Sequence, residues 1–182
     1  MSTLTARLPF AAVPASRPAN PFDISPRQRT LIALVGGAMT LAVLVALVRG
    51  LGGIAPDHAA MDHLAIVIHV ATVVPAIPLG AYLLLSRKGT KAHKLLGRVW
   101  VALMVATALS AIFIKVGGNY SVIHIFVPLT LIASWKLVAT ARRGDMKGHR
   151  KEILSLYLGA LTIPGIASMA IPGRLMNVWL LG

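Results

Sequence analysis

Five long apolar stretches without a charged side chain dominate this chain and restrict what it can fold into. They cover residues 30–48, 63–85, 99–114, 116–135 and 153–173. A helix that crosses the hydrocarbon core of a bilayer needs about 20 mostly apolar residues. The expected fold is therefore all-α, a polytopic membrane helix bundle with five transmembrane helices.

Composition supports lipid as the solvent of this chain. Of its residues 57% are hydrophobic and 13% are charged, whereas a soluble domain carries about 25% charged residues. The net charge of +13 would suggest nucleic-acid binding in a soluble protein. Here the cations lie in short clusters between apolar stretches, so the expected partner is the lipid bilayer and not a nucleic acid. The chain has no cysteine, which excludes thiolate metal sites and cysteine nucleophiles.

The distribution of basic residues predicts an orientation. The N-terminal tail and the loops after the second and fourth stretches hold fifteen of the 18 lysines and arginines. Arg49, Lys115 and Arg174 are the remaining three. Because loops rich in lysine and arginine stay in the cytoplasm, the N-terminus is expected inside and the C-terminus outside. Residues 1–29, which are rich in proline, are predicted to form a disordered cytoplasmic tail, and residues 30–49 the first transmembrane helix.

A weak internal repeat organises the histidines. The second and fourth apolar stretches share a Val-Ile-His element that contains His69 and His124, 55 residues apart. The basic loops that follow contain His93 and His149, 56 residues apart. Residues 61–182 are therefore predicted to form a four-helix core of two repeated hairpins, with the first helix as an addition. Hairpins of this kind are related by an axis along the membrane normal.

This symmetry predicts two facing histidine pairs on opposite leaflets. His69 would meet His124 near the outer surface, and His93 would meet His149 near the cytoplasmic surface. Ionisable residues inside a membrane suggest function, because an unpaired polar group is costly there. Neutral imidazole is an axial ligand of haem iron. The candidate cofactor is therefore a b-type haem, with His69 and His124 as the iron ligands and His93 and His149 as a second cofactor-binding pair.

Simpler interpretations remain open for the same residues. A single histidine within a bundle often bonds to a neighbouring carbonyl or hydroxyl group. His93 and His149 lie among lysines and arginines, so lipid phosphates could explain them equally well. His58 and His63 each follow an aspartate, which suggests an outer metal site or simply a solvated loop. The aromatic residues near the expected helix ends fit interfacial anchors; they are Trp100, Trp135, Trp179 and Tyr82.

Several motifs resemble a known family. They are the run KGTKAHKLLGRVW from Lys88 to Trp100, the pairs Ile123-His124 and His149-Arg150, and the ending PGRLM from Pro172 to Met176. Together they resemble the bacterial membrane-protein family called domain of unknown function 2306, over roughly residues 61–182. The resemblance implies a bacterial cytoplasmic membrane, with the C-terminus in the periplasm, and brings no established activity.

A looser similarity links the four histidines to the ascorbate-reducible transmembrane b-type cytochromes. Those proteins carry one histidine on each of four consecutive helices and coordinate two haems, one in each leaflet. His69, His93, His124 and His149 follow that order. This chain departs from the pattern because His93 and His149 are expected at or beyond the membrane interface and not within a leaflet.

Two functions follow from these interpretations. The first is a haem protein that carries single electrons across or within the membrane, together with a redox partner. The second is a non-enzymatic membrane subunit or assembly factor of a larger complex, in which the histidines are structural. The sequence leaves open whether the protein is an enzyme. We find no paired membrane carboxylates, phosphate loop or nucleophile motif in the sequence.

Overall fold

The computed structural model describes residues 24–115 and 118–182, and every regular element within these ranges is helical. The elements are, in order, α1 (Pro26–Leu51), η1 (Ala59–Asp62), α2 (Leu64–Leu85), α3 (Lys91–Ala111), η2 (Val122–Ile125), α4 (Phe126–Arg142), α5 (Met146–Leu154), η3 (Ser155–Thr162), α6 (Ile163–Ala170) and α7 (Leu175–Leu181). Five segments are long and apolar enough to cross a membrane. The prediction of an all-α polytopic bundle is confirmed.

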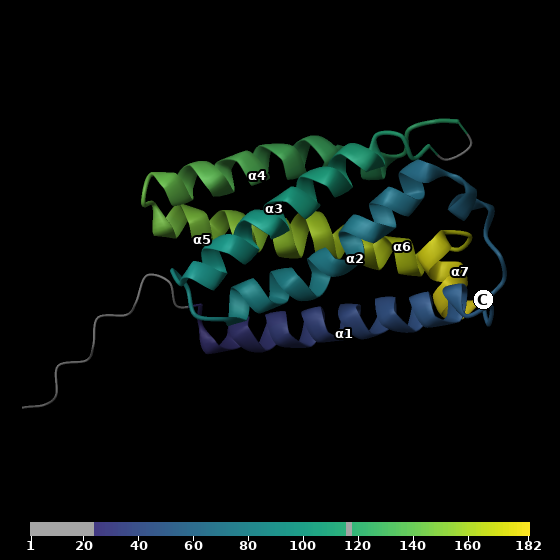
Figure 1. The fold of residues 1–182 in the computed structure, drawn as a ribbon, viewed down its shortest axis with the longest axis horizontal. Helices are drawn as coiled ribbons and strands as arrows, with labels where there is room; N and C mark the ends of the chain where they lie inside the picture. Colours follow the sequence, from purple (N-terminus) through teal and green to yellow (C-terminus); the bar gives the residue numbers. More distant parts are fainter. Residues whose placement is uncertain (1–23, 116–117) are drawn as a thin grey trace, which may run out of the picture.

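Four of these segments form a closed ring. Helix α2 packs against α3, α3 against α4, and α4 against α5 and η3, while η3 returns to contact α2. Helix α1 lies outside this ring along α2 (Figure 1) and also contacts α7. This arrangement matches the predicted four-helix core with one added helix.

The first helix begins earlier than the sequence suggested. Ser25 caps it by accepting a hydrogen bond from the backbone N–H of Gln28, and the Gln28 side chain returns a bond to Ser25. Pro26 fits the first helical position, where no backbone donor is needed. The helix therefore starts at Pro26 and includes the last residues of the predicted tail, 1–29. Residues 1–23 lie outside the described part of the chain.

The third transmembrane helix also begins earlier, at Lys91 and not at Val99. The Thr90 side chain accepts a hydrogen bond from the His93 backbone N–H at 3.0 Å and so caps the helix. The charges in this first part of the helix do not prevent helix formation, because long basic side chains extend toward the polar region. This extension places Trp100 in the middle of α3, where it is fully buried. Its prediction as an interfacial anchor is wrong.

The fifth transmembrane segment is a composite of α5, η3 and α6. Its central part, Ser155–Thr162, is π-helical. Pro164 lies two residues after this stretch and has no N–H to donate to the turn before it, which disrupts the regular helical ladder there. Thr162 compensates in part by donating its hydroxyl to the carbonyl of Tyr157 at 2.8 Å.

Positive-φ glycines follow the predicted repeat. Gly89 and Gly144, which precede α3 and α5, are 55 residues apart and have φ values of 78° and 72°. Gly118 and Gly173 are also 55 residues apart, with φ values of 80° and 77°. These backbone conformations favour glycine because it lacks a Cβ atom. The shared turns support two related hairpins.

The centre of the core is built around Gly80 of α2. A Cβ atom at this position would lie 2.6 Å from the Tyr157 ring and 2.7 Å from Trp100 Nε1. Both aromatic residues are fully buried. Trp100 donates to the carbonyl of Ala76 at 2.9 Å, and Tyr157 donates to that of Ile77 at 3.2 Å. These bonds join α3 and η3 to α2 beside its internal prolines.

A second cluster of buried residues lies at the end of the bundle that contains the C-terminus (Figure 1). Trp179 of α7 is 3% exposed, so its prediction as an interfacial anchor is also wrong. Its indole ring lies against Gly50, where an added Cβ atom would clash with the ring. The Arg49 guanidinium donates to the backbone carbonyls of Trp179 and Gly182, which neutralises the C-terminal end of α7.

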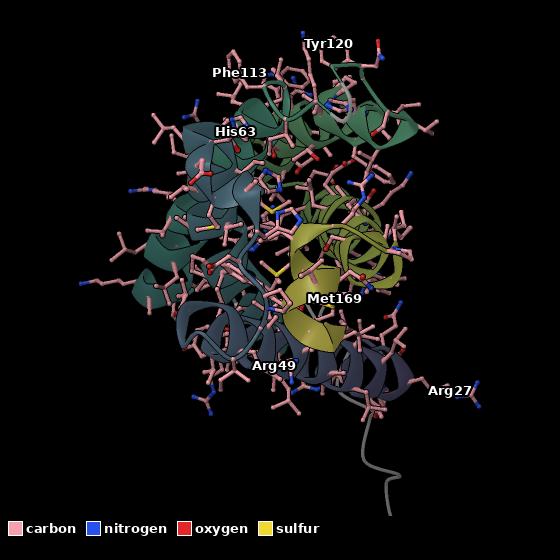
Figure 2. All side chains as sticks on the ribbon, turned by 90° about the vertical axis from the view of Figure 1, so that its right-hand side faces the viewer. Arg27, Arg49, His63, Phe113, Tyr120 and Met169 are labelled. Atoms are coloured by element: carbon pink, nitrogen blue, oxygen red, sulfur yellow. The ribbon has the colours of Figure 1, made fainter. Side chains whose placement is uncertain are left out.

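The basic loops lie together at one end of the bundle. The start of α1, the α2–α3 turn and the α4–α5 turn share the left end in Figure 1. There Arg29 donates to the carbonyl of Leu85 at 3.3 Å, and Arg27 projects away from the helices (Figure 2). We call this the basic end. The C-terminus and the other connections lie at the opposite end.

Candidate functional site

His69 of α2 joins two helices near the end opposite the basic end. Its Nδ1–H donates to the carbonyl of Thr107 in α3 at 3.0 Å, and Ser110 Oγ lies 3.2 Å from the same nitrogen. Next to it, Thr107 donates its hydroxyl to that of Thr72 at 2.9 Å. This polar row links α2 to α3 within the membrane-spanning part of the bundle.

His124 lies in η2, at the entrance to α4, and both of its ring nitrogens have partners. Nε2–H donates to the carbonyl of Ile114 at 2.9 Å, which assigns the tautomer. Nδ1 then accepts from the backbone N–H of Ser121 at 3.1 Å. Tyr120 contacts the ring edge-on, with ring centroids 4.9 Å apart. The imidazole thus closes the turn between α3 and α4.

The outer pair does not fit a haem held between its two rings. An axial ligand needs an imidazole lone pair that is not shared. The lone pair of His124 accepts the N–H of Ser121, so this ring has none left for an iron. His69 donates Nδ1–H to the Thr107 carbonyl and keeps its Nε2 lone pair, so the misfit comes from His124. Coordination by both residues would have to open the turn before α4. The structure directs each ring to a different backbone carbonyl and does not pair them.

The inner histidines both lie in the first turns of helices that begin at the basic end (Figure 1), His93 in α3 and His149 in α5. His93 lies within electrostatic range of His149 and of Lys88. His149 Nδ1–H donates to the carbonyl of Leu137 in α4 at 3.1 Å, which leaves Nε2 for another contact. The Nδ1 atom of His93 is buried and has no hydrogen-bond partner among the residues described. The α3 and α5 ends therefore bring this pair to one region.

His58 is a further histidine with a structural bond. Its Nε2–H donates to the carbonyl of Gly173 at 3.2 Å, and its Nδ1 accepts from the Ala60 N–H at 3.1 Å. The ring thereby ties the α1–α2 connection to the turn before α7. Sequence spacing gave no signal for this long-range contact. Within residues 24–115 and 118–182, no group of three or more histidine, aspartate or glutamate residues could hold a metal ion.

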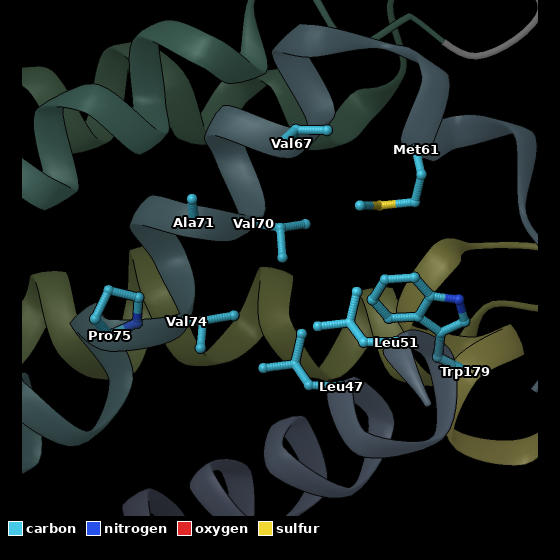
Figure 3. A pocket seen from close by; sticks show the side chains of 9 residues that line it. All are labelled: Leu47, Leu51, Met61, Val67, Val70, Ala71, Val74, Pro75 and Trp179. Atoms are coloured by element: carbon cyan, nitrogen blue, oxygen red, sulfur yellow. The ribbon is translucent and has the colours of Figure 1, made fainter. Parts of the chain in front are cut away.

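An apolar hollow lies between α1, α2 and α7 (Figure 3). It has a volume of about 250 Å³ and is lined by Leu47, Leu51, Met61, Val67, Val70, Ala71, Val74, Pro75 and Trp179. A binding site of defined specificity usually has a few placed polar groups, whereas this lining is entirely apolar. It suits hydrocarbon chains and gives no site for chemistry.

A second hollow, of about 320 Å³, lies between α4 and the α5–η3 segment. Lys136, Lys151 and Glu152 contribute charged groups to it. No histidine lines either hollow. In the sequence, Lys136 and Lys151 belong to the cations that predict the orientation, and their common groove was not predicted. Both lysines lie at a similar distance from the α4–α5 turn, on two antiparallel helices. This similar distance is the signal in the sequence that could have revealed the shared groove.

A comparison with protein families supports a membrane protein. A family model described as "Predicted membrane protein (DUF2306)" matches residues 66–177, the part that contains nearly all of the four-helix ring and the start of α7. The search of curated proteins and the search of solved structures each returned no match. With more than half of its length matched, the chain belongs to the DUF2306 family of membrane proteins.

Proposed function

We propose that this protein is a non-enzymatic integral-membrane subunit or assembly factor of a larger complex, in which the histidines hold the bundle together. The proposal places it in the bacterial cytoplasmic membrane with the basic end in the cytoplasm. The concentration of cations at one end supports that orientation. The lipid-facing helix surfaces and the basic end remain available for partners.

The observation that carries the proposal is the common use of the histidine rings. Four of them donate to backbone carbonyls of other segments, at distances between 2.9 and 3.2 Å. The four are His58, His69, His124 and His149. Bonds of this kind in a membrane protein contribute about 0.6 kcal/mol on average and up to about 1.7 kcal/mol. A set of such bonds fixes the helices relative to one another and favours a rigid scaffold.

A second candidate function is electron transfer by a b-type haem on the inner pair. The observation that favours it is the unpartnered Nδ1 atom of His93 near His149. His149 also donates Nδ1–H to a carbonyl, as a metal-ligating histidine commonly does. Bound haem would supply one-electron redox chemistry. The chain itself would contribute the imidazole lone pairs and the nearby cation Lys88.

One experiment separates the two candidates. The full chain is purified in mild detergent from haem-replete cells, and its absorption is recorded oxidised and after dithionite reduction. For the scaffold we expect no Soret band. We also expect that His69→Ala, His124→Ala and His149→Ala each reduce the free energy of unfolding by about 0.6–1.7 kcal/mol.

His63→Ala is the matched control, because its side chain is exposed and makes no capping bond at the start of α2. It should unfold like the wild type. A Soret band that persists in His69→Ala and disappears in His93→Ala and His149→Ala would instead establish the haem protein. If the protein, extracted from its native membrane with mild detergent, migrates as an isolated monomer on a native gel, that result would contradict a subunit role.

A further inference from the structure

The groove between α4 and the α5–η3 segment combines two exposed cations with a long apolar wall. Lys136 comes from α4 and Lys151 from α5, and both line the groove. Lys136 lies six residues before the end of α4, and Lys151 five residues after the start of α5. At 1.5 Å per residue both are about 8–9 Å from the turn. The two ammonium groups therefore enter the groove at similar depth.

The apolar wall runs away from these lysines along one face of α4. It consists of Phe126, Leu129, Ile132 and Ala133. Phe126, Leu129 and Ile132 follow one another at steps of three residues, and Ala133 lies four residues after Leu129, so all four share one side of the helix. From Lys136 to Phe126 the wall spans ten residues, which corresponds to about 15 Å. That is half of the hydrocarbon thickness of about 30 Å, the depth of one leaflet.

The opposite wall of the groove is formed by small side chains, which leave space between the two helices. Ser155, Gly159 and Ala160 form it, all from the π-helical stretch. Gly159 has no heavy atom within 4 Å of the place where a Cβ atom would stand. Ser155 lies four residues before Gly159 and five before Ala160, which matches the wider π-helical turn. Open space thus follows the small residues between the two helices.

We propose that this groove binds one anionic glycerophospholipid of the leaflet at the basic end. The phosphate lies between Lys136 and Lys151, and one acyl chain follows the wall from Ile132 to Phe126. Glu152 lines the same end of the groove. A carboxylate accepts hydrogen bonds, so it favours a headgroup with hydroxyl donors, as in phosphatidylglycerol, over the methylated amine of phosphatidylcholine.

The charge of the two lysines, their depth in the groove and the length of the apolar wall together favour a lipid as the occupant. Cations near a membrane surface attract anionic lipids, and basic pockets between transmembrane helices bind lipid headgroups. A free phosphate would use the lysines and leave the apolar wall without a partner. A hydrocarbon chain alone would use the wall and leave two lysines facing the single carboxylate of Glu152, so the groove would keep a net positive charge. A lipid with both parts matches the whole groove.

The test is native mass spectrometry of the full chain in detergent, titrated with dioleoyl phosphatidylglycerol or dioleoyl phosphatidylcholine. We expect one phosphatidylglycerol molecule to bind at least tenfold more tightly than phosphatidylcholine. Lys136→Gln with Lys151→Gln should weaken its binding by about 25-fold, since each lysine contributes about fivefold. Gly159→Leu should weaken it as well, because the new side chain enters the acyl groove.

The controls separate a built site from general surface charge. Lys91→Gln with Lys94→Gln removes the same charge from α3, where both side chains are exposed and do not line the groove. Gly37→Leu adds the same side chain on α1, at a glycine with open space around it. Both controls should bind phosphatidylglycerol like the wild type. The proposal would be overturned if Lys91→Gln/Lys94→Gln lost as much affinity for phosphatidylglycerol as Lys136→Gln/Lys151→Gln. It would also be overturned if both lipids bound equally tightly, or if inorganic phosphate displaced phosphatidylglycerol.

Discussion

Single residues decide how closely the helices of this bundle approach one another. Gly80 allows Trp100 and Tyr157 to meet on α2, and Gly50 allows Trp179 to lie on the end of α1. Lipid tails are as apolar as the helix surfaces, so no hydrophobic force drives helices together in a membrane. Helix packing is therefore stabilised by small residues, which allow close approach, and by interhelical hydrogen bonds. The bonds from Trp100 and Tyr157 to α2 carbonyls act at the same place.

Gly80→Ala should therefore destabilise the protein. The added Cβ atom would stand 2.6 Å from the Tyr157 ring and 2.7 Å from Trp100 Nε1, and such overpacking costs about 1–3 kcal/mol. Gly97→Ala is the control, because Gly97 lies in α3 with open space around it. It should be neutral or stabilising by up to about 1 kcal/mol. The free energy of unfolding in mixed micelles, measured by SDS titration, checks both; equal values for the two variants would refute this core.

At the scale of the elements, the two hairpins use related turns. Each basic turn contains a positive-φ glycine followed by a capping residue, Gly89-Thr90 before α3 and Gly144-Asp145 before α5. The caps accept hydrogen bonds from the backbone N–H groups of His93 and Gly148 at 3.0 and 2.9 Å. The repeat is thus supported by backbone conformation as well as by the histidine spacing.

Removing either cap should have a similar effect. Thr90→Ala and Asp145→Ala each leave helix N–H groups without an acceptor, and each should lower the free energy of unfolding by about 1 kcal/mol. Thr90→Ser and Asp145→Asn keep an oxygen acceptor and should stay near the wild-type value. Thermal unfolding of the purified full chain followed by circular dichroism measures these differences. A large loss in one hairpin and none in the other would argue against equivalent turns.

For the whole molecule, the collection of cations at one end predicts the orientation in the membrane. Arg29 and Lys88 lie at this end and bind the C-terminal carbonyls of α2, from Leu83 to Ser86. Cations near a helix C-terminus are favourable because they complement its dipole. The basic end therefore both stabilises α2 and supplies the topology signal.

The absence of cysteine from the sequence makes the orientation directly measurable. Ala141→Cys places a thiol at the basic end, and Ala59→Cys places one at the opposite end; both alanines are exposed. In intact cells a membrane-impermeant maleimide should label Ala59→Cys alone, and after permeabilisation it should label both. The reverse pattern would mean that the basic end faces outward, against the positive-inside rule.

The sequence by itself determined the number of transmembrane segments, their helical class and the end at which the charges gather. These properties depend on segment length, apolarity and charge, which are local and additive along the chain. It did not reveal that Trp100 is a core residue. The basic residues at the start of α3 made the helix seem to begin at Val99, so Trp100 was expected at its end and not in its middle. It also gave no sign of α7 lying across the end of α1.

Tertiary structure alone decided how the histidines are used. A ring nitrogen can bind a metal, a second imidazole or a carbonyl with nearly the same local sequence around it, so the choice depends on which atom the neighbouring helix presents. Rotation by one residue turns a side chain by about 100° around its helix. The register between α2 and α3 therefore directs His69 to the Thr107 carbonyl. In the same way, the packing of α4 against the π-helical stretch decides that Lys136 and Lys151 share one groove.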